Sequence, residues 1–250
     1  MLKFVKILIQ VKHFMLVAET TKSLEKLSQL SNRPLRLVAL GDSTIYGFGD
    51  PEGGGWVERL RREWMSPESP GHILYNLGVR GDRAEQVGQR LENEFHYRGE
   101  LRNTKPDAII LSVGTNDSAR VQKPDGRNLT DFEKFNIDIN NLLDTAKDLS
   151  QVFFVGMVPV DASKMPFLGC MYYNHAEQYR YKEATRLACL RRDIPYLDIF
   201  EKWLNRGDRW WMSRICEDGL HPNVDGYKAL FNDVSAWEPL AELTRTMEKI

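Results

Sequence analysis

Residues 35–44 read LRLVALGDST, an apolar run that passes directly into Gly41, Asp42, Ser43 and Thr44. A short apolar run that ends in glycine is typical of a buried strand followed by a tight turn. Four more such runs follow at residues 73–77, 108–113, 152–158 and 194–197. Helical patterns lie between the runs at residues 56–64, 84–95, 131–149 and 173–192, with a last helix after Pro222. This alternation predicts an α/β fold: a five-stranded parallel sheet in a three-layer α/β/α sandwich.

The composition indicates one globular domain behind an N-terminal extension. The 250 residues are 42% hydrophobic and 28% charged, which is enough for one α/β domain. The polar stretch at residues 28–34 resembles a linker, so we expect an extension and linker at residues 1–34 and the working domain at residues 35–250. Lysines interrupt the apolar opening, which favours an appended helix and a cytoplasmic protein; a poor export signal or a mis-set start codon remains open.

Charge and cysteine content exclude several classes of protein. The chain has 34 basic and 35 acidic residues, so no global field attracts nucleic acid or an anionic membrane. Cys170, Cys189 and Cys216 are odd in number and lack metal-ligand spacing, which argues against a disulfide scaffold. We therefore expect a small-molecule partner, no metal or cofactor, no nucleic acid and no stable membrane insertion. The sequence leaves the oligomeric state open.

Residues that can carry chemistry follow three successive strands. Ligands in open parallel sheets bind beyond the carboxyl ends of the strands. The first strand leads to Ser43, a candidate nucleophile, the second to Gly81, and the third to Asn116. A backbone N–H at Gly81 and the side-chain amide of Asn116 are suitable donors to an oxyanion, together with the amide of Ser43 itself. Each residue alone is also ordinary turn or helix-cap material.

A fourth signal lies near the C-terminus, where Asp218 precedes His221 by three residues. This spacing allows the carboxylate to hold Nδ1 of the histidine and leaves Nε2 free as a general base for Ser43. A lone histidine is more often a capping or surface residue. The four signals together nevertheless favour a serine ester hydrolase with catalytic Ser43, His221 and Asp218 and an oxyanion hole of Ser43, Gly81 and Asn116.

The four blocks around Ser43, Gly81, Asn116 and His221 resemble the SGNH hydrolases, also called the GDSL esterase and lipase family. The resemblance covers about residues 35–230 and is nearest the compact bacterial esterases and thioesterases. It implies a flavodoxin-like sandwich, metal-free hydrolysis through an acyl-enzyme, and Asp218 as the residue that orients His221. The family includes arylesterases, thioesterases, lysophospholipases and carbohydrate deacetylases, so its name does not choose a substrate.

Two positions depart from the family pattern. The first block reads Gly-Asp-Ser-Thr where the family has leucine last, and Arg80 stands before Gly81 where small residues are usual. Arg80 either faces an oxyanion or an acidic substrate group, or points outward and pairs with a surface carboxylate. Asp42, beside Ser43, is a further candidate for oxyanion or substrate binding.

Two aromatic segments bear on the substrate. Residues 159–179 contain Met165, Phe167, Leu168, Met171, Tyr172 and Tyr173, which either wall an acyl or aromatic pocket or pack as a helical core. The run RGDRWWMSR at residues 206–214 either faces a substrate, partner or membrane, or packs beneath the loop that presents His221.

The chain lacks a long apolar lid insertion, which favours small soluble esters with short acyl groups. Acyl thioesters, lysophospholipids and O-acetylated carbohydrates are the alternatives, and acyl transfer to an alcohol is a further one. A non-enzymatic alternative is a flavodoxin-like protein that uses residues 42–47 to bind a phosphate or a flavin.

Overall fold

The apolar run at residues 35–40 forms most of an inner strand of a parallel sheet. The computed structural model describes residues 34–65, 71–98, 101–102 and 104–245, so the expected extension at residues 1–33 lies outside the described part. Strand β1 (Arg36–Gly41) pairs with β2 (Ile73–Gly78) on one side and with β3 (Ala108–Ser112) on the other. Strands β5 (Gln151–Val155) and β7 (Tyr196–Leu197) continue beyond β3, which gives the order β2-β1-β3-β5-β7, all parallel.

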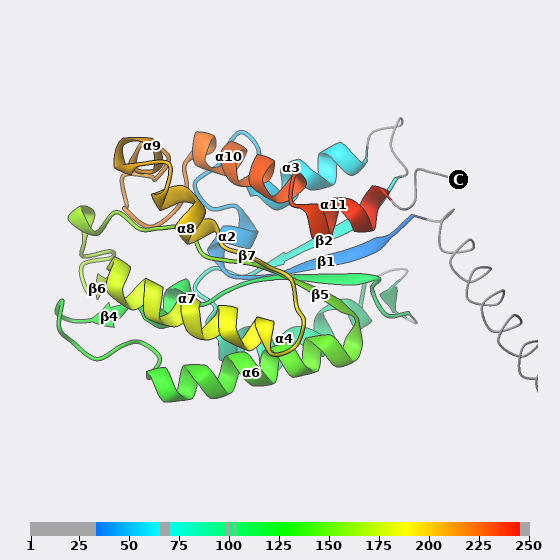
Figure 1. Cartoon of the computed structure of the whole chain (residues 1–250), viewed down its shortest axis with the longest axis horizontal. Helices are drawn as coiled ribbons and strands as arrows, with labels where there is room; N and C mark the ends of the chain where they lie inside the picture. Colours follow the sequence, from blue (N-terminus) through cyan, green and yellow to red (C-terminus); the bar gives the residue numbers. More distant parts are fainter. Residues whose placement is uncertain (1–33, 66–70, 99–100, 103, 246–250) are drawn as a thin grey trace, which may run out of the picture.

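Helices cover both faces of this sheet (Figure 1). One layer contains α3 (Gly55–Trp64), α8 (Ile199–Leu204), α9 (Asp208–Met212), α10 (Val224–Ser235) and α11 (Glu238–Arg245). The other contains α4 (Ala84–His96), α6 (Phe132–Leu149) and α7 (His175–Leu190). Successive β1 side chains alternate between the two layers: Leu37 and Ala39 join the first apolar core, and Val38 and Leu40 join the second. The predicted three-layer α/β/α fold with five parallel strands is confirmed.

Polar contacts accompany two of the expected boundaries that differ from the structure: one strand ends earlier and one helix begins later. The strand expected at residues 152–158 ends at Val155, and beyond it the Gln178 side chain accepts from the Val160 N–H and donates to the Val158 carbonyl. The helix expected at residues 173–192 is α7, which begins only after Asn174, whose side chain caps it by accepting from the Glu177 N–H.

Several short elements were not expected from the sequence. They are α2 (Ser43–Tyr46), α5 (Thr115–Ser118), η2 (Ala162–Lys164), α8, α9 and the antiparallel pair β4 (Arg120–Val121) and β6 (Met171–Tyr172). Helices α2 and α5 begin beside the carboxyl ends of β1 and β3, and β4 with β6 lies at the same end of the molecule (Figure 1). Within the ranges that the structure covers, no helix combines the length and apolarity needed to cross a membrane.

The run at residues 206–214 forms α9 and its flanks. Trp211 is buried in the first core, as the packing alternative predicts. Trp210 is half-buried, and the guanidinium groups of Arg206 and Arg214 lie over its ring, 4.4 and 3.8 Å from the centroid. These arginines therefore belong to a local aromatic cluster on the first helical layer.

Candidate active site

The turn between β1 and α2 holds Ser43 at the carboxyl edge of the sheet. Gly41 has to lack a side chain, since a Cβ there would lie 1.9 Å from the Ser112 carbonyl oxygen on β3. The carboxylate of Asp42 caps α2 by accepting from the Thr44 N–H at 2.9 Å. Ser43 is consequently the first residue of a short helix, with its backbone N–H at the helix N-terminus.

Ser43, His221 and Asp218 form a hydrogen-bonded line. Ser43 Oγ lies 2.9 Å from His221 Nε2, and His221 Nδ1 lies 2.6 Å from Asp218 Oδ2. The other oxygen of Asp218 accepts from the backbone N–H groups of Leu220 and His221 at 2.9 and 3.0 Å.

Burial acts to raise the pKa of Asp218, but the hydrogen bonds from the His221 ring and the two backbone amides outweigh it and lower the pKa. The ionised Asp218 favours the proton on Nδ1 of His221. Nε2 is then free to accept the hydroxyl proton of Ser43.

Three residues that can donate to an oxyanion, Ser43, Gly81 and Asn116, line the same cleft. The N–H groups of Ser43 and Gly81 have no acceptor within the described part of the chain. Gly81 has φ +85°, a conformation that favours glycine, and a Cβ added there would meet no atom within 4 Å. Asn116 Nδ2 donates to the Asp82 carbonyl at 2.8 Å, which fixes the amide and leaves its second N–H for a ligand. Such a set suits a developing oxyanion.

Arg90 holds the loop that carries Gly81 through hydrogen bonds, a role that its place in the sequence did not indicate. Its Nε donates to Asp82 Oδ2 at 2.7 Å. Its two Nη groups donate to the carbonyls of Leu77 and Gly41 at 2.9 and 3.0 Å. One side chain therefore ties the Gly81 loop to the ends of β1 and β2.

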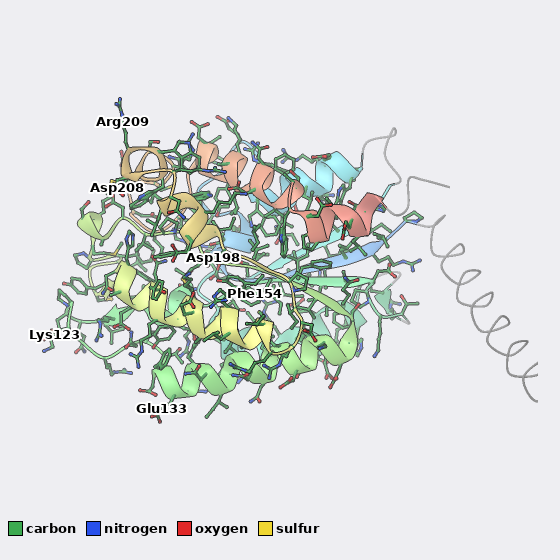
Figure 2. All side chains as sticks on the ribbon, in the orientation of Figure 1. Lys123, Glu133, Phe154, Asp198, Asp208 and Arg209 are labelled. Atoms are coloured by element: carbon green, nitrogen blue, oxygen red, sulfur yellow. The ribbon has the colours of Figure 1, made fainter. Side chains whose placement is uncertain are left out.

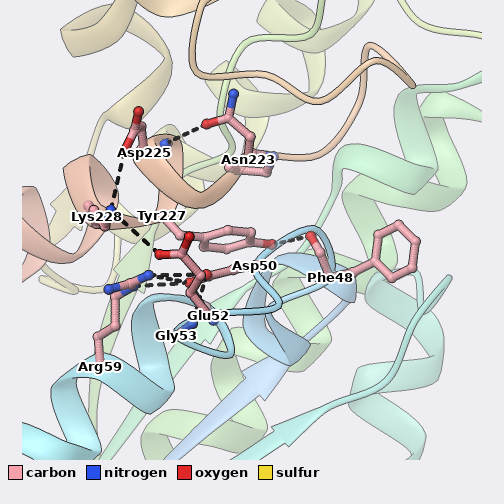
Figure 3. Close-up of polar contacts among 12 residues, drawn as sticks. Phe48, Asp50, Glu52, Gly53, Arg59, Asn223, Asp225, Tyr227 and Lys228 are labelled. Atoms are coloured by element: carbon pink, nitrogen blue, oxygen red, sulfur yellow. Dashed lines mark hydrogen bonds and ion pairs between the residues drawn. The ribbon is translucent and has the colours of Figure 1, made fainter.

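Phe48 and Tyr227 were also missed. The Phe48 ring packs edge-on against the His221 ring, with 4.6 Å between the centroids. The Tyr227 hydroxyl on α10 donates to the Phe48 carbonyl at 2.9 Å (Figure 3). The sequence signal near Phe48 is the glycine-rich run at residues 47–55, which indicates a tight loop but names no site residue.

The nucleophile, the base and the oxyanion donors lie beside a cleft of about 400 Å³. It is lined by Ser43, Arg80, Gly81, Asn116, Leu129, Phe167, Leu168, Met171, Leu220 and His221. The expected pocket segment at residues 159–179 therefore contributes a wall. Its aromatic and apolar residues from Met165 to Tyr173 lie outside any helix, although Tyr173 packs in a small core with Phe167 and Met171. Tyr173 is buried and donates to Asn116 Oδ1 at 3.4 Å, and desolvation by burial raises its pKa.

The two further candidates of the sequence analysis lie in different places. Asp42 does not line the cleft: it is 2% exposed, its carboxylate is engaged in the α2 cap, and burial raises its pKa to about 6. Arg80 lines the cleft, and its guanidinium carbon lies 3.9 Å from the centroid of the Phe48 ring.

A hydroxyl, an imidazole and a carboxylate in hydrogen-bonded sequence, at the carboxyl edge of a parallel α/β/α sheet, define a serine hydrolase. The chain belongs to the GDSL-like lipase/acylhydrolase family, whose family model matches residues 39–229. It is accordingly a serine hydrolase that acts on ester bonds. The alternative of a phosphate-binding or flavin-binding protein is wrong, because the family match and the hydrogen-bonded Ser43, His221 and Asp218 define a hydrolase.

The chain is also similar to known proteins in sequence and in fold. The chain is 24% identical over 211 residues to the "Uncharacterized protein YpmR" of Bacillus subtilis (strain 168), covering 78% of this chain and 77% of that protein. Its fold is similar to that of a lipase/acylhydrolase from Enterococcus faecalis, with a TM-score of 0.62, 17% identity and coverage of 80% and 93%. It is also similar to the acetylxylan esterase Axe2 from Geobacillus stearothermophilus, with a TM-score of 0.60, 15% identity and coverage of 82% and 94%.

Proposed function

We propose that the chain hydrolyses small soluble esters with short acyl groups, and that Ser43, His221 and Asp218 carry the reaction. The observation that supports this most is the line of hydrogen bonds from Ser43 Oγ through the His221 ring to Asp218, which opens on the cleft. Each neighbour in this line is within the distance that proton transfer requires.

The reaction proceeds through an acyl-enzyme. As Ser43 Oγ attacks the acyl carbon, His221 Nε2 takes its proton, and the carbonyl oxygen becomes an oxyanion that the Ser43, Gly81 and Asn116 donors stabilise. The bond from the acyl carbon to the alcohol oxygen then breaks, and His221 returns the proton to the leaving alcohol. Water repeats the sequence with His221 as base, releases the carboxylic acid and restores the Ser43 hydroxyl.

The cleft supports a small substrate. A volume of about 400 Å³ lies at the lower end of the range for small-molecule sites. Its apolar wall from Leu129, Phe167 and Met171 suits a short acyl or aromatic group. The likeness to an acetylxylan esterase adds acetylated carbohydrates to the substrates to be assayed, beside acyl thioesters and lysophospholipids.

The test uses 4-nitrophenyl esters with acyl chains from acetate to palmitate, and a fluorophosphonate label read by mass spectrometry. We expect the wild type to prefer the short chains and to carry one adduct, on Ser43. The variant Ser43→Ala should lose about 10⁴-fold or more in kcat and take no label. Activity that survives in Ser43→Ala would sink the assigned nucleophile, and a maximum at palmitate would sink the short-acyl preference.

A further inference from the structure

Arg80 is stacked against the residues of the candidate active site. Its guanidinium carbon lies 3.9 Å from the Phe48 ring centroid, and the Phe48 ring in turn packs against His221. A guanidinium that stacks on an aromatic ring uses its face for that contact. Its N–H groups lie in the guanidinium plane and remain available as donors.

No protein group in the described part of the chain uses those donors. Arg59, Arg90 and Arg120 are each paired with a carboxylate at 2.8 Å or less. Arg80, in contrast, has no carboxylate within 4.0 Å and no hydrogen-bond acceptor among the described residues. Arg80 is exposed, as the outward alternative expects, but no surface carboxylate pairs with it among the described residues.

The composition of the cleft makes this cation distinctive. Among the described residues that line the cleft, Arg80 is the only one with a permanent charge, and none is an aspartate or a glutamate. Leu129, Phe167 and Met171 give the same cleft an apolar lining. A substrate in the cleft that holds Ser43 therefore meets one unpaired guanidinium and an apolar lining.

We propose that Arg80 selects esters that carry a negatively charged group, a carboxylate, sulfonate or phosphate, within a few bonds of the scissile ester. This inference rests on the proposed function and adds the charge of the substrate to it. The guanidinium fork binds such groups through two parallel charge-assisted hydrogen bonds, which a neutral ester does not form. The Phe48 stack restricts the side chain, so less conformational entropy is lost when the anion binds.

The experiment compares two matched pairs of esters. The first is the monoanion of 4-nitrophenyl adipate against methyl 4-nitrophenyl adipate, with the charge on the acyl side. The second is 3-acetoxybenzoate against its methyl ester, with the charge on the leaving group. The quantity measured is the ratio of kcat/KM for the charged ester to that for its neutral partner, each rate corrected for uncatalysed hydrolysis. Uniform effects of a substitution cancel in this ratio.

In at least one pair, Arg80→Gln should lower the ratio by about tenfold to a hundredfold, the range for a hydrogen bond to a charged group. Arg80→Lys should retain part of the preference, because it keeps the charge and loses the fork. Arg209→Gln is the control. Arg209 extends from α9 into solvent (Figure 2) and lies outside the cleft lining, so the same loss of one positive charge should leave the ratio unchanged.

A ratio that Arg80→Gln leaves unchanged in both pairs overturns the inference, even if both rates fall together. An equal fall would instead assign Arg80 to stabilising the oxyanion. Failure of the proposed function looks different: the wild type would hydrolyse neither the charged esters, nor their neutral partners, nor 4-nitrophenyl acetate.

Discussion

Two buried carboxyl groups lie at the carboxyl edge of the sheet, Asp42 after β1 and Asp117 in α5. Asp117 is fully buried, and one of its oxygens accepts from the Ala84 N–H at 3.1 Å, while the other has no hydrogen-bond partner. Burial raises the pKa of each to about 6, and the nearby charge of Asp42 adds to the rise in the pKa of Asp117. Both groups therefore oppose folding when they ionise.

The substitution Asp117→Asn should stabilise the protein at high pH relative to the wild type. In the wild type the folded pKa of about 6 exceeds the ordinary value of 3.8, so the folded state keeps a proton that the unfolded state has lost. The associated stability is full below pH 3.8 and is lost as the pH rises through about 6. Asparagine does not ionise, so the variant avoids this loss.

Urea unfolding at about pH 4 and about pH 8 measures the effect. The difference in unfolding free energy, variant minus wild type, should grow by about 2 kcal/mol between the two. Asp125→Asn, at an exposed carboxylate, is the control and should show no such change. A difference for Asp117→Asn that is the same at both pH values would show that Asp117 is not protonated in the folded state.

At the scale of elements, the loop between α2 and α3 is organised by one buried carboxylate. Asp50 Oδ1 accepts from the Gly53 N–H, and Oδ2 accepts from the Gly55 N–H. Arg59 on α3 donates to both oxygens at 2.8 to 3.1 Å (Figure 3). The loop thus fixed carries Phe48, which packs on the candidate base His221. The shape of the site depends on this loop.

Asp50→Asn should lower the unfolding free energy by about 3 kcal/mol, because its new NH₂ group would face the donors that now bind a carboxylate oxygen. The activity on 4-nitrophenyl acetate should fall as well, since Phe48 loses its support. Asp225→Asn serves as the matched control in the same region (Figure 3): its carboxylate is 74% exposed, and we expect a change within about 0.5 kcal/mol. Equal urea midpoints for the two variants would contradict this account of the loop.

How much of this was predictable from sequence differs between elements. The five strands could be predicted because short apolar runs bounded by turn residues are typical of buried strands. The carboxyl ends of parallel strands lie at one edge of the sheet, which predicts that Ser43, Gly81 and Asn116 lie close together. The strands β4 and β6 have two residues each, too few for any periodicity to appear. The cleft wall near Leu168 was consequently expected only as an aromatic segment of undecided shape.

The supporting residues were not predictable, because their contacts join distant parts of the chain. Arg90 meets the Gly41 carbonyl across 49 residues, and Tyr227 meets the Phe48 carbonyl across 179. Nothing in the local sequence distinguishes Arg90 from other helical arginines. The roles of the candidate residues stay predictions, which the Ser43→Ala assay tests.

At the scale of the whole molecule, the sheet is enclosed by described residues on both faces. Side chains of β1 pack into both apolar cores, one on each face of the sheet, and β1 is hydrogen-bonded to both β2 and β3. Among the residues that the structure describes, the first buried one is Leu35, whose N–H donates to His72 Nδ1 at 3.1 Å. We therefore expect the folding unit to begin next to Leu35.

A protein that begins at Pro34 should keep the free energy of unfolding and the kcat/KM of the full chain, since it retains every described contact to β1. A second truncation, beginning at Val38, should not fold, because it removes the first two pairs that β1 makes with β2 and the first that it makes with β3. Urea unfolding followed by circular dichroism, with 4-nitrophenyl acetate as substrate, compares the three proteins. A loss of more than about 1 kcal/mol in the first truncation would mean that residues 1–33 contribute to the stability of the domain, and the domain boundary would then have to move towards the N-terminus.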